Sequence, residues 1–444
     1  MGTLWPTAQR AAAGAAVERA HRWLLLAILW LFFFNALLDR LTAYYLGLAL
    51  FTNLYYGLMG LAVAVRVLMA VARGRDQPLA IWAAGALIVV TLLGVLYGDP
   101  LASIFGVKQF FIGFVFLLIF AGHQFPANAV LGALLLVQMY ALFQGVHFLT
   151  QELTLPPWDM AYVRAQMESW EARNLYQANL IRPFATFASF AEYQIVVHIL
   201  GVGLFVLRDL VPPRERVGTW MVLLSLVVVD VLLPDRTPIM MSGIVLASTW
   251  LGVTLIHGAR ANPARFVVGV GLLALFLSLF WVVPALFLDS ETLALRRLAE
   301  AFRFWEAETV RERMATAWSV SIELIRFHPE GLGPASVATS YNPNALVPHN
   351  NYFLFAVGYS VLFPFTFVFA LFFGFRRVFA LMGADDRQRA RIGFCATGVT
   401  LAYLTSSVFN ASFSSYMGAA YFLLMQWLYT SAVGGAIVTD EGLG

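Results

Sequence analysis

Residues 265–288 read RFVVGVGLLALFLSLFWVVPALFL, and this stretch decides the fold class of the chain. After Arg265 it contains no charged residue. A helix needs about 20 apolar residues to cross the hydrocarbon of a bilayer, so this stretch is long enough to do so. Comparable stretches recur along the sequence, which predicts an all-α polytopic membrane protein of about twelve transmembrane helices.

The composition of the whole chain points the same way. Of 444 residues, 60% are apolar and only 12% are charged, whereas about a quarter of the residues of a soluble domain are charged. We therefore interpret residues 1–444 as a single integral membrane domain. We expect helices at 23–38, 48–72, 78–97, 104–122, 127–149, 190–207, 217–234, 238–257, 265–288, 351–375, 391–409 and 412–431.

The distribution of basic residues predicts the orientation. With both termini in the cytoplasm, the short outer loops contain only Arg40, Lys108 and Arg236. The inner segments then collect a much larger set, as the positive-inside rule requires. That set is Arg10, Arg19, Arg22, Arg73, Arg75, Arg208, Arg214, Arg216, Arg260, Arg265, Arg376, Arg377, Arg387, Arg389 and Arg391.

Two long segments then face outward, 150–189 and 289–350, the second lying between the ninth and tenth helices. The second is a large outward loop in which apolar residues recur at spacings of three and four. Such spacing predicts amphipathic helices that lie on the membrane surface or against the bundle. The two apolar sets are Leu295, Leu298, Phe302 and Trp305, and Met314, Trp318, Ile322 and Ile325.

Polar groups gather near the outer face. Charges near hydrocarbon are costly and commonly face an interior or a water-filled cavity. Guanidinium groups from distant segments suit an anionic, phosphate-bearing ligand. The groups are Arg182 and Glu192 beside the sixth helix, Asp230, Asp235 and Arg236 at the end of the seventh, and Arg311, Arg313, His349 and Asn350 in the second segment.

Each of these groups also has a structural interpretation. Arg182 can be a loop charge, Arg236 can pair with Asp235, and Arg311 and Arg313 can form the solvated face of a helix. His349 can make a local hydrogen bond at a helix N-terminus. His198 and Gln194, within the sixth helix, are typical of hydrogen bonds between membrane helices, and Gly331 and Gly333 are typical of a turn.

Several chemistries lack their residues in this sequence. It contains no HExxH, no Asp-rich metal motif in an outer loop, no GxSxG and no Walker loop. Cys395 is the single cysteine, so disulfides and thiolate clusters within the chain are excluded. We expect no metal and no cofactor. Because no basic patch with an aromatic platform is present, we expect no nucleic-acid partner.

Four pieces, in order, resemble the O-antigen ligase and O-antigen polymerase superfamily of bacterial envelope glycosyltransferases. They are Arg182 to Tyr193, Asp235-Arg236-Thr237, Arg313 to Gly333, and His349-Asn350-Asn351-Tyr352 followed by Gly358. Together they cover about the last 60% of the chain. The resemblance departs from the family at two places. Counted back from Pro329, the family's arginine falls on Met314, so Arg311 or Arg313 takes that role or neither does, and Asp235 stands where the family has Ser or Thr.

The resemblance implies a metal-independent, inverting transfer of a glycan from undecaprenyl diphosphate to an acceptor hydroxyl, on a glycan or a lipid. The enzyme would lie in the bacterial inner membrane with its site facing the periplasm. Arg236 and Arg313 would bind the diphosphate, Arg182 would add a contact, and His349 would activate the acceptor.

Polymerase and ligase share this donor chemistry, and the longer outer segment favours the polymerase only slightly. A secondary transporter or flippase of an amphipathic anion is the rival class. Transporters commonly show paired halves with charges at mid-membrane, whereas the polar residues here gather at one face. An inert assembly subunit is a third alternative.

Overall fold

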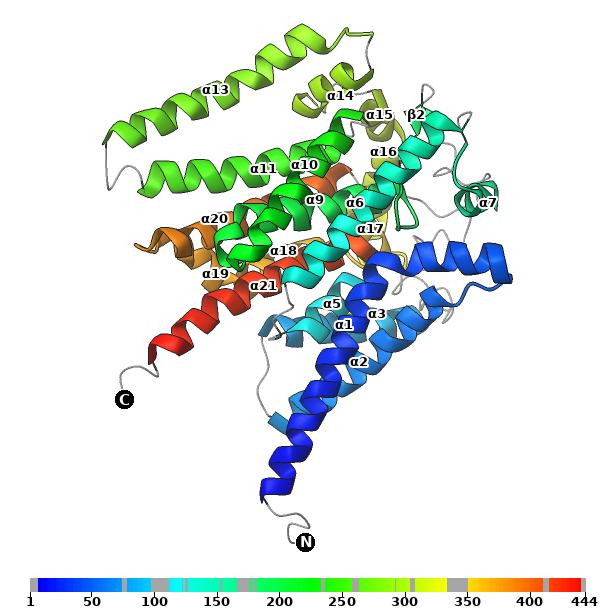
Figure 1. Cartoon of the computed structure of the whole chain (residues 1–444), viewed down its shortest axis with the longest axis vertical. Coiled ribbons are helices and arrows are strands. Elements are labelled where there is room, and N and C mark those ends of the chain that lie inside the picture. Colours follow the sequence, from blue (N-terminus) through cyan, green and yellow to red (C-terminus); the bar gives the residue numbers. More distant parts are fainter. Residues whose placement is uncertain are drawn as a thin grey trace.

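The computed structural model describes residues 7–73, 78–96, 112–121, 123, 127–151, 154–165, 176–177, 180–181, 183–232, 236–257, 263–291, 293–303, 308–333, 350–409 and 415–440. These residues are almost entirely helical (Figure 1). The helices of the first half are α1 (Thr7–Leu46), α2 (Phe51–Arg73), α3 (Pro78–Leu96), α5 (Ile112–Phe120), α6 (Ala127–Thr150), α7 (Pro157–Ala165), α9 (Phe190–Val206) and α10 (Arg216–Leu232).

The second half continues with α11 (Arg236–Gly252), α13 (Pro263–Phe287), α14 (Leu293–Phe302), α15 (Glu308–Arg313), α16 (Ser319–Phe327), α17 (Asn351–Gly358), α18 (Leu362–Gly374), α19 (Arg376–Ala380), α20 (Arg387–Phe409) and α21 (Ser415–Asp440). Short 3₁₀ turns cover Arg208–Leu210, Pro213–Glu215 and Leu381–Gly383, and π-helical turns cover Val253–His257 and Met314–Trp318. Strands β1 (Tyr176–Gln177) and β2 (Leu180–Ile181) form a small antiparallel pair.

Apolar helices place the protein in a membrane. Among the described residues, five helical segments have the length and hydropathy of a membrane span. A sixth is counted if the pair Leu362–Gly374 and Arg376–Gly383, which bends by 55°, forms one span. The five segments are Ala16–Leu46, Phe51–Met69, Ala127–Thr150, Thr237–Leu255 and Phe266–Phe287. Each of the twelve predicted ranges contains a helix, although in the part of the chain that the structure describes only these segments meet the criterion for a span.

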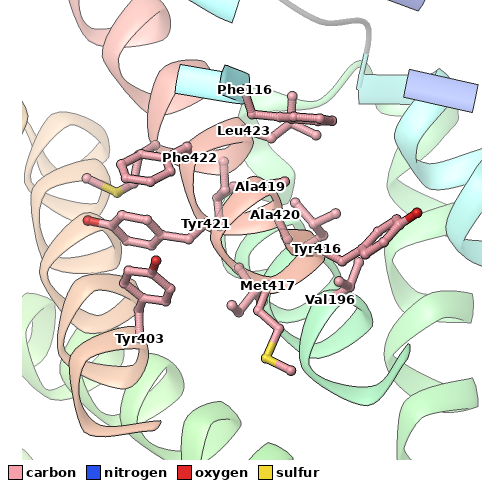
Figure 2. Close-up of a cluster of buried hydrophobic side chains, with 14 of the residues drawn as sticks. Phe116, Val196, Tyr403, Tyr416, Met417, Ala419, Ala420, Tyr421, Phe422 and Leu423 are labelled. Atoms are coloured by element: carbon pink, nitrogen blue, oxygen red, sulfur yellow. The ribbon is translucent and has the colours of Figure 1, made fainter. Parts of the chain in front are cut away.

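The core forms around α21, which packs against α5, α9 and α20. Figure 2 shows this cluster, in which the rings of Tyr403 and Tyr421 stack with centroids 4.1 Å apart. Thr400 lies 3.0 Å from the Tyr421 hydroxyl. Gly113 lets α5 approach closely, because a Cβ there would lie 3.0 Å from the backbone of Gly418. Small residues at such crossings are typical of helix packing in membranes.

The start of α1 and the end of α21 lie away from the described helices of the two long segments. In Figure 1 the start of α1 lies at the lower edge and the end of α21 at the lower left, and α7, β2, α15 and α16 lie at the upper right. The segment between α13 and α17 contains helices α14, α15 and α16, as its amphipathic spacing predicts. Trp305 lies outside the described residues, and Met314 and Ile322 are exposed.

The predicted helix 351–375 is wrong as a single helix, because α17 and α18 are separated at residues 359–361. The backbone N–H of Leu332 donates to the carbonyl of Val357 (2.7 Å), which would accept from Val361 in a continuous helix. The N–H of Val361 donates to the carbonyl of Pro329 instead (2.9 Å). Pro364, in the first turn of α18, has no N–H to continue the ladder. Hydrogen bonds to the backbone of Pro329 and Leu332, in the turn after α16, therefore replace the helical hydrogen bonds at the break.

Candidate functional site

The described residues include only part of the site predicted from the sequence. Arg182, Asp235 and His349 lie outside them, and Arg236 is described only by its backbone, as the first residue of α11. Arg311 is exposed in the last turn of α15, and Arg313, the last residue of that helix, is half-buried. Glu192 and Asn350 both lie within the described residues.

Asn350 is the N-cap residue of α17 and directly follows His349 in the sequence. Its backbone is extended, and its side-chain Oδ1 accepts hydrogen bonds from the N–H groups of Tyr352 (2.9 Å) and Phe353 (3.2 Å). This is an N-cap, which satisfies backbone donors that a helix start leaves without partners. Asn350 is buried, so the start of α17 is fixed in the protein.

Helix α16 lies beside α17 and runs in the same direction. At their beginnings the rings of Trp318 and Phe353 are in edge contact, with centroids 5.8 Å apart. At their ends Pro329 is bonded to Val361 through the backbone. Because like ends pair, the N-terminal side that carries Arg313 and the N-terminal side that follows His349 lie at the same end of the helix pair.

A turn that contains Gly331 and Gly333 holds α16 beside α17. Gly331 has a φ of +89° and Gly333 a φ of +84°, values that favour glycine. A Cβ at Gly331 would lie 2.7 Å from the backbone carbon of Tyr359, so the turn sits directly against the break after α17. The turn interpretation of this glycine pair is confirmed.

A π-helical turn, Met314–Trp318, directly follows Arg313. A π turn accommodates one more residue than an α turn and commonly occurs at functional sites. The side chains on its two sides are consequently offset relative to an uninterrupted helix. Of the predicted apolar face, Met314 and Ile322 are exposed and Trp318 and Ile325 are half-buried.

Glu192 lies in the first turn of α9, where its N–H donates to the side chain of Ser189 (3.2 Å). Ser189 and Glu192 have the spacing of a capping box. Glu192 is within electrostatic reach of Tyr55, Tyr56 and Tyr416. In the same region Asn35 donates to the Tyr416 hydroxyl (2.7 Å), so α1, α2, α9 and α21 contribute to one polar group.

His198 and Asp230 join α9 to α10 inside the bundle. His198 Nε2 lies 2.9 Å from the Asp230 carboxylate, and Nδ1 lies 2.6 Å from the carbonyl of Gln194. A carbonyl only accepts, so Nδ1 carries a hydrogen and Nε2 faces the acid. The predicted interhelical hydrogen bond of His198 is confirmed. The Gln194 amide makes no such bond within the described part of the chain.

Sequence reasoning missed a buried ion pair. Arg40 was expected in a short outer loop, but α1 continues to Leu46 and Arg40 is buried inside the protein. Its Nε lies 3.3 Å from Asp159 of α7. Tyr140 and Gln144 of α6 each donate to the other oxygen of Asp159 at 2.8 Å. This buried pair could have been suspected from the polar residues that interrupt the apolar run, which are Asn35, Asp39 and Arg40.

The same network holds the backbone that follows Arg182. Arg40 donates to the carbonyl of Ala185, and the N–H of Ala185 donates to Gln144 (2.9 Å). Ala185 has a φ of +48°, an unusual value for a residue with a Cβ. Burial raises the pKa of Asp159, and the charge of Arg40 and the hydrogen bond from Gln144 oppose that rise. The network fixes the 183–187 segment against α1 and α6.

Within the described residues, no group of three or more His, Cys, Asp or Glu side chains is placed to hold a metal ion. No known family model matches this chain, and no curated protein matches it. The function is therefore argued from residues and geometry.

Proposed function

We propose that this protein is a glycosyltransferase of the bacterial inner membrane that uses an undecaprenyl-diphosphate-linked glycan as donor. The site would face the periplasm, with both termini in the cytoplasm and about twelve membrane crossings. In Figure 1 the start of α1 and the end of α21 lie toward one edge and α7, α15 and α16 toward the other, which supports this orientation. The acceptor would be a hydroxyl of a glycan, for a polymerase, or of a second lipid, for a ligase.

The observation that carries the proposal is the docking of α16 beside α17 in the same direction. The Trp318–Phe353 contact and the Pro329–Val361 bond pair like ends of the two helices. The guanidinium of Arg313 and the imidazole of His349 would therefore both lie at the N-terminal end of the α16–α17 pair. A side chain that binds the diphosphate and a side chain that accepts a proton must lie close together to act on the same substrate.

The π-helical turn supports Arg313 as the family's arginine. Counted back along the sequence from Pro329, the position of the family's arginine falls on Met314, one residue after Arg313. A turn that takes up one extra residue, at Met314–Trp318, accounts for that offset. Arg313 is also half-buried, whereas Arg311 is exposed, which favours Arg313 as the ligand.

The proposed reaction is a direct displacement. The acceptor oxygen bonds to the anomeric carbon as the bond between that carbon and the diphosphate oxygen breaks. His349 takes the proton of the acceptor hydroxyl, and the lipid diphosphate leaves with its added negative charge. Arg236 and Arg313 would stabilise that charge, a contribution typically worth about 10²–10³ in rate per group.

The test is release of lipid diphosphate by the purified full-length chain, given undecaprenyl-diphosphate-linked glycan without added metal. Acceptors are supplied in separate arms, one a glycan and one a lipid. We expect acceptor-dependent release that falls at least about 100-fold in His349→Ala, Arg236→Ala and Arg313→Ala. His328→Ala and Arg326→Ala are matched controls, because both residues are exposed near the far end of α16, and they should retain release.

Two results would overturn the proposal. Movement of the lipid-linked glycan across vesicles without bond cleavage would assign the transporter instead. Release that survives in all three variants would leave the arginines and His349 without a role in the transfer.

A further inference from the structure

Residues 183–189, which we call the buried segment, contain neither helix nor strand and lead directly into α9. Every residue of the buried segment except Ala188 is buried. Buried irregular segments are uncommon, because each backbone N–H and C=O group inside a protein needs a partner. In a membrane protein such backbone occurs where protein encloses it or where it lines a polar cavity. The partners of its backbone groups therefore indicate why this segment is retained.

Arg40 and Gln144 hold both backbone polar groups of Ala185. Arg40 of α1 donates to the carbonyl, and Gln144 of α6 accepts from the N–H (2.9 Å). Asp159 of α7 contacts both side chains, because Arg40 Nε lies 3.3 Å from its Oδ1 and Gln144 donates to its Oδ2 (2.8 Å). These contacts keep Ala185 at a φ of +48°, which residues with a Cβ rarely adopt.

Two more hydrogen bonds hold the buried segment beyond Ala185. The N–H of Leu37 in α1 donates to the carbonyl of Thr186 (3.2 Å), and the Tyr162 hydroxyl of α7 donates to the carbonyl of Ala188 (2.9 Å). The chain is therefore held by remote helices from a point three residues after Arg182 up to the start of α9.

The charges of Arg40 and Asp159 are not explained by stability alone. Their side chains are closed to solvent, and Oδ1 of Asp159 accepts no hydrogen bond within the described residues. Removing two charges from water costs energy that such a pair often fails to return, and apolar side chains of similar volume are often more stabilising. Strained backbone that its surroundings enforce is typical of functional sites. The network therefore favours a role in fixing one conformation of the buried segment.

We propose that Arg40, Asp159 and Gln144 are positioning residues, which hold the buried segment so that Arg182 contacts the diphosphate of the lipid-linked donor. This inference rests on the proposed function, because it takes Arg182 as a diphosphate ligand. A guanidinium binds phosphate through directed hydrogen bonds, so its contribution depends on where the backbone places it. The three positioning residues are themselves buried, so they act through the buried segment and not by contact with the ligand.

The experiment titrates the purified full-length protein in neutral detergent with undecaprenyl diphosphate and follows binding by intrinsic tryptophan fluorescence. We expect Arg182→Ala and Gln144→Met each to weaken binding at least about tenfold, which corresponds to one charged hydrogen bond to phosphate. Together they should weaken it no further than Arg182→Ala alone, because Gln144 acts through Arg182. Gln138→Met is the matched control and should leave binding unchanged. Gln138 is likewise buried on α6, but its hydrogen bond comes from Tyr193 of α9.

A further variant separates positioning from stability. Arg40→Met/Asp159→Leu removes both charges and should recover most of the stability that Arg40→Met loses. It should still bind undecaprenyl diphosphate at least about tenfold more weakly than the wild type, because the buried segment is no longer held. Ala185→Gly added to this variant should restore part of the affinity, since glycine adopts a positive φ without help from the network.

Three results would overturn the inference. They are wild-type affinity in Arg182→Ala, wild-type affinity in Arg40→Met/Asp159→Leu, and effects of Arg182→Ala and Gln144→Met that multiply. A wild type that binds undecaprenyl diphosphate with the expected coupling, but releases none from the lipid-linked glycan, would refute the transferase and leave this inference standing. Release by the wild type together with multiplying effects would refute this inference alone.

Discussion

Arg40 and Asp159 form a salt bridge that is closed to solvent, with Nε and Oδ1 3.3 Å apart and the two side chains 2% and 0% exposed. The pair joins α1 to α7 across 119 residues of sequence. Through Arg40 it also holds the carbonyl of Ala185. The pair is therefore a clamp on the segment that follows Arg182.

Removing one member of this pair should destabilise the protein strongly. Arg40→Met leaves the Asp159 carboxylate buried without its cation, which typically costs about 3–5 kcal/mol. The double variant Arg40→Met/Asp159→Leu should recover much of that loss, because neither charge remains. Unfolding midpoints in detergent measure both. The matched control is Asp209→Asn, which breaks the partly exposed pair with Arg391 and should cost less than about 1 kcal/mol. A double variant no better than Arg40→Met would contradict the clamp.

Gly331→Ala should destabilise the α16–α17 connection. The residue must keep a φ of +89°, which costs about 1–2 kcal/mol for a residue with a Cβ, and the new Cβ would overlap the Tyr359 backbone. Gly383→Ala is the control, since nothing lies within 4 Å of a Cβ there. Thermal unfolding of the two variants gives the comparison, and equal midpoints would argue against the tight turn.

Asn350→Ala should remove the N-cap of α17 and cost about 1 kcal/mol. Asn350→Asp keeps an acceptor oxygen and should be nearly neutral. If the transferase proposal is correct, the Ala variant also loses rate because His349 is less well positioned, and the Asp variant retains it. Stability and lipid diphosphate release, measured on the same samples, separate the two effects. Loss of release in both variants with no loss of stability would count against the cap as the cause.

Asp230→Ala should cost about 1–3 kcal/mol, because it leaves Nε2 of the buried His198 without its partner. Asp230→Asn should cost less, because the amide N–H can donate to Nε2 while Nδ1 continues to donate to Gln194. Denaturant midpoints of the two variants test this order. Equal losses would mean that the carboxylate charge, rather than a hydrogen bond, holds α9 to α10.

Hydropathy placed each predicted range over helical residues, because a helix in hydrocarbon must be apolar along its length, but it predicted one helix where α17 and α18 are separate. The same reasoning placed Arg40 in a loop, since its partner Asp159 is remote in sequence and a single charge gives no sign of being paired. The break after α17 depends on backbone bonds from Pro329 and Leu332, which no local pattern encodes.

The candidate site was predictable only in part. The spacing of Gly331 and Gly333 predicted their turn. The family pattern, counted back from Pro329, falls on Met314 and left open whether Arg311, Arg313 or neither has the family arginine's role. The π turn after Arg313 was not predictable, because its sequence, Met314–Trp318, has ordinary helix-forming residues. The roles of Arg236, Arg182, Asp235 and His349 stay predictions.

The most direct test of the central claim is the distance between spin labels at positions 313 and 349, attached to cysteines in a Cys395→Ala background. Two parallel helices packed 8–10 Å apart, with both positions just beyond their N-terminal contact, predict a backbone separation of roughly 10–20 Å. A distribution centred beyond about 30 Å, the length of a 20-residue helix, would contradict a shared site.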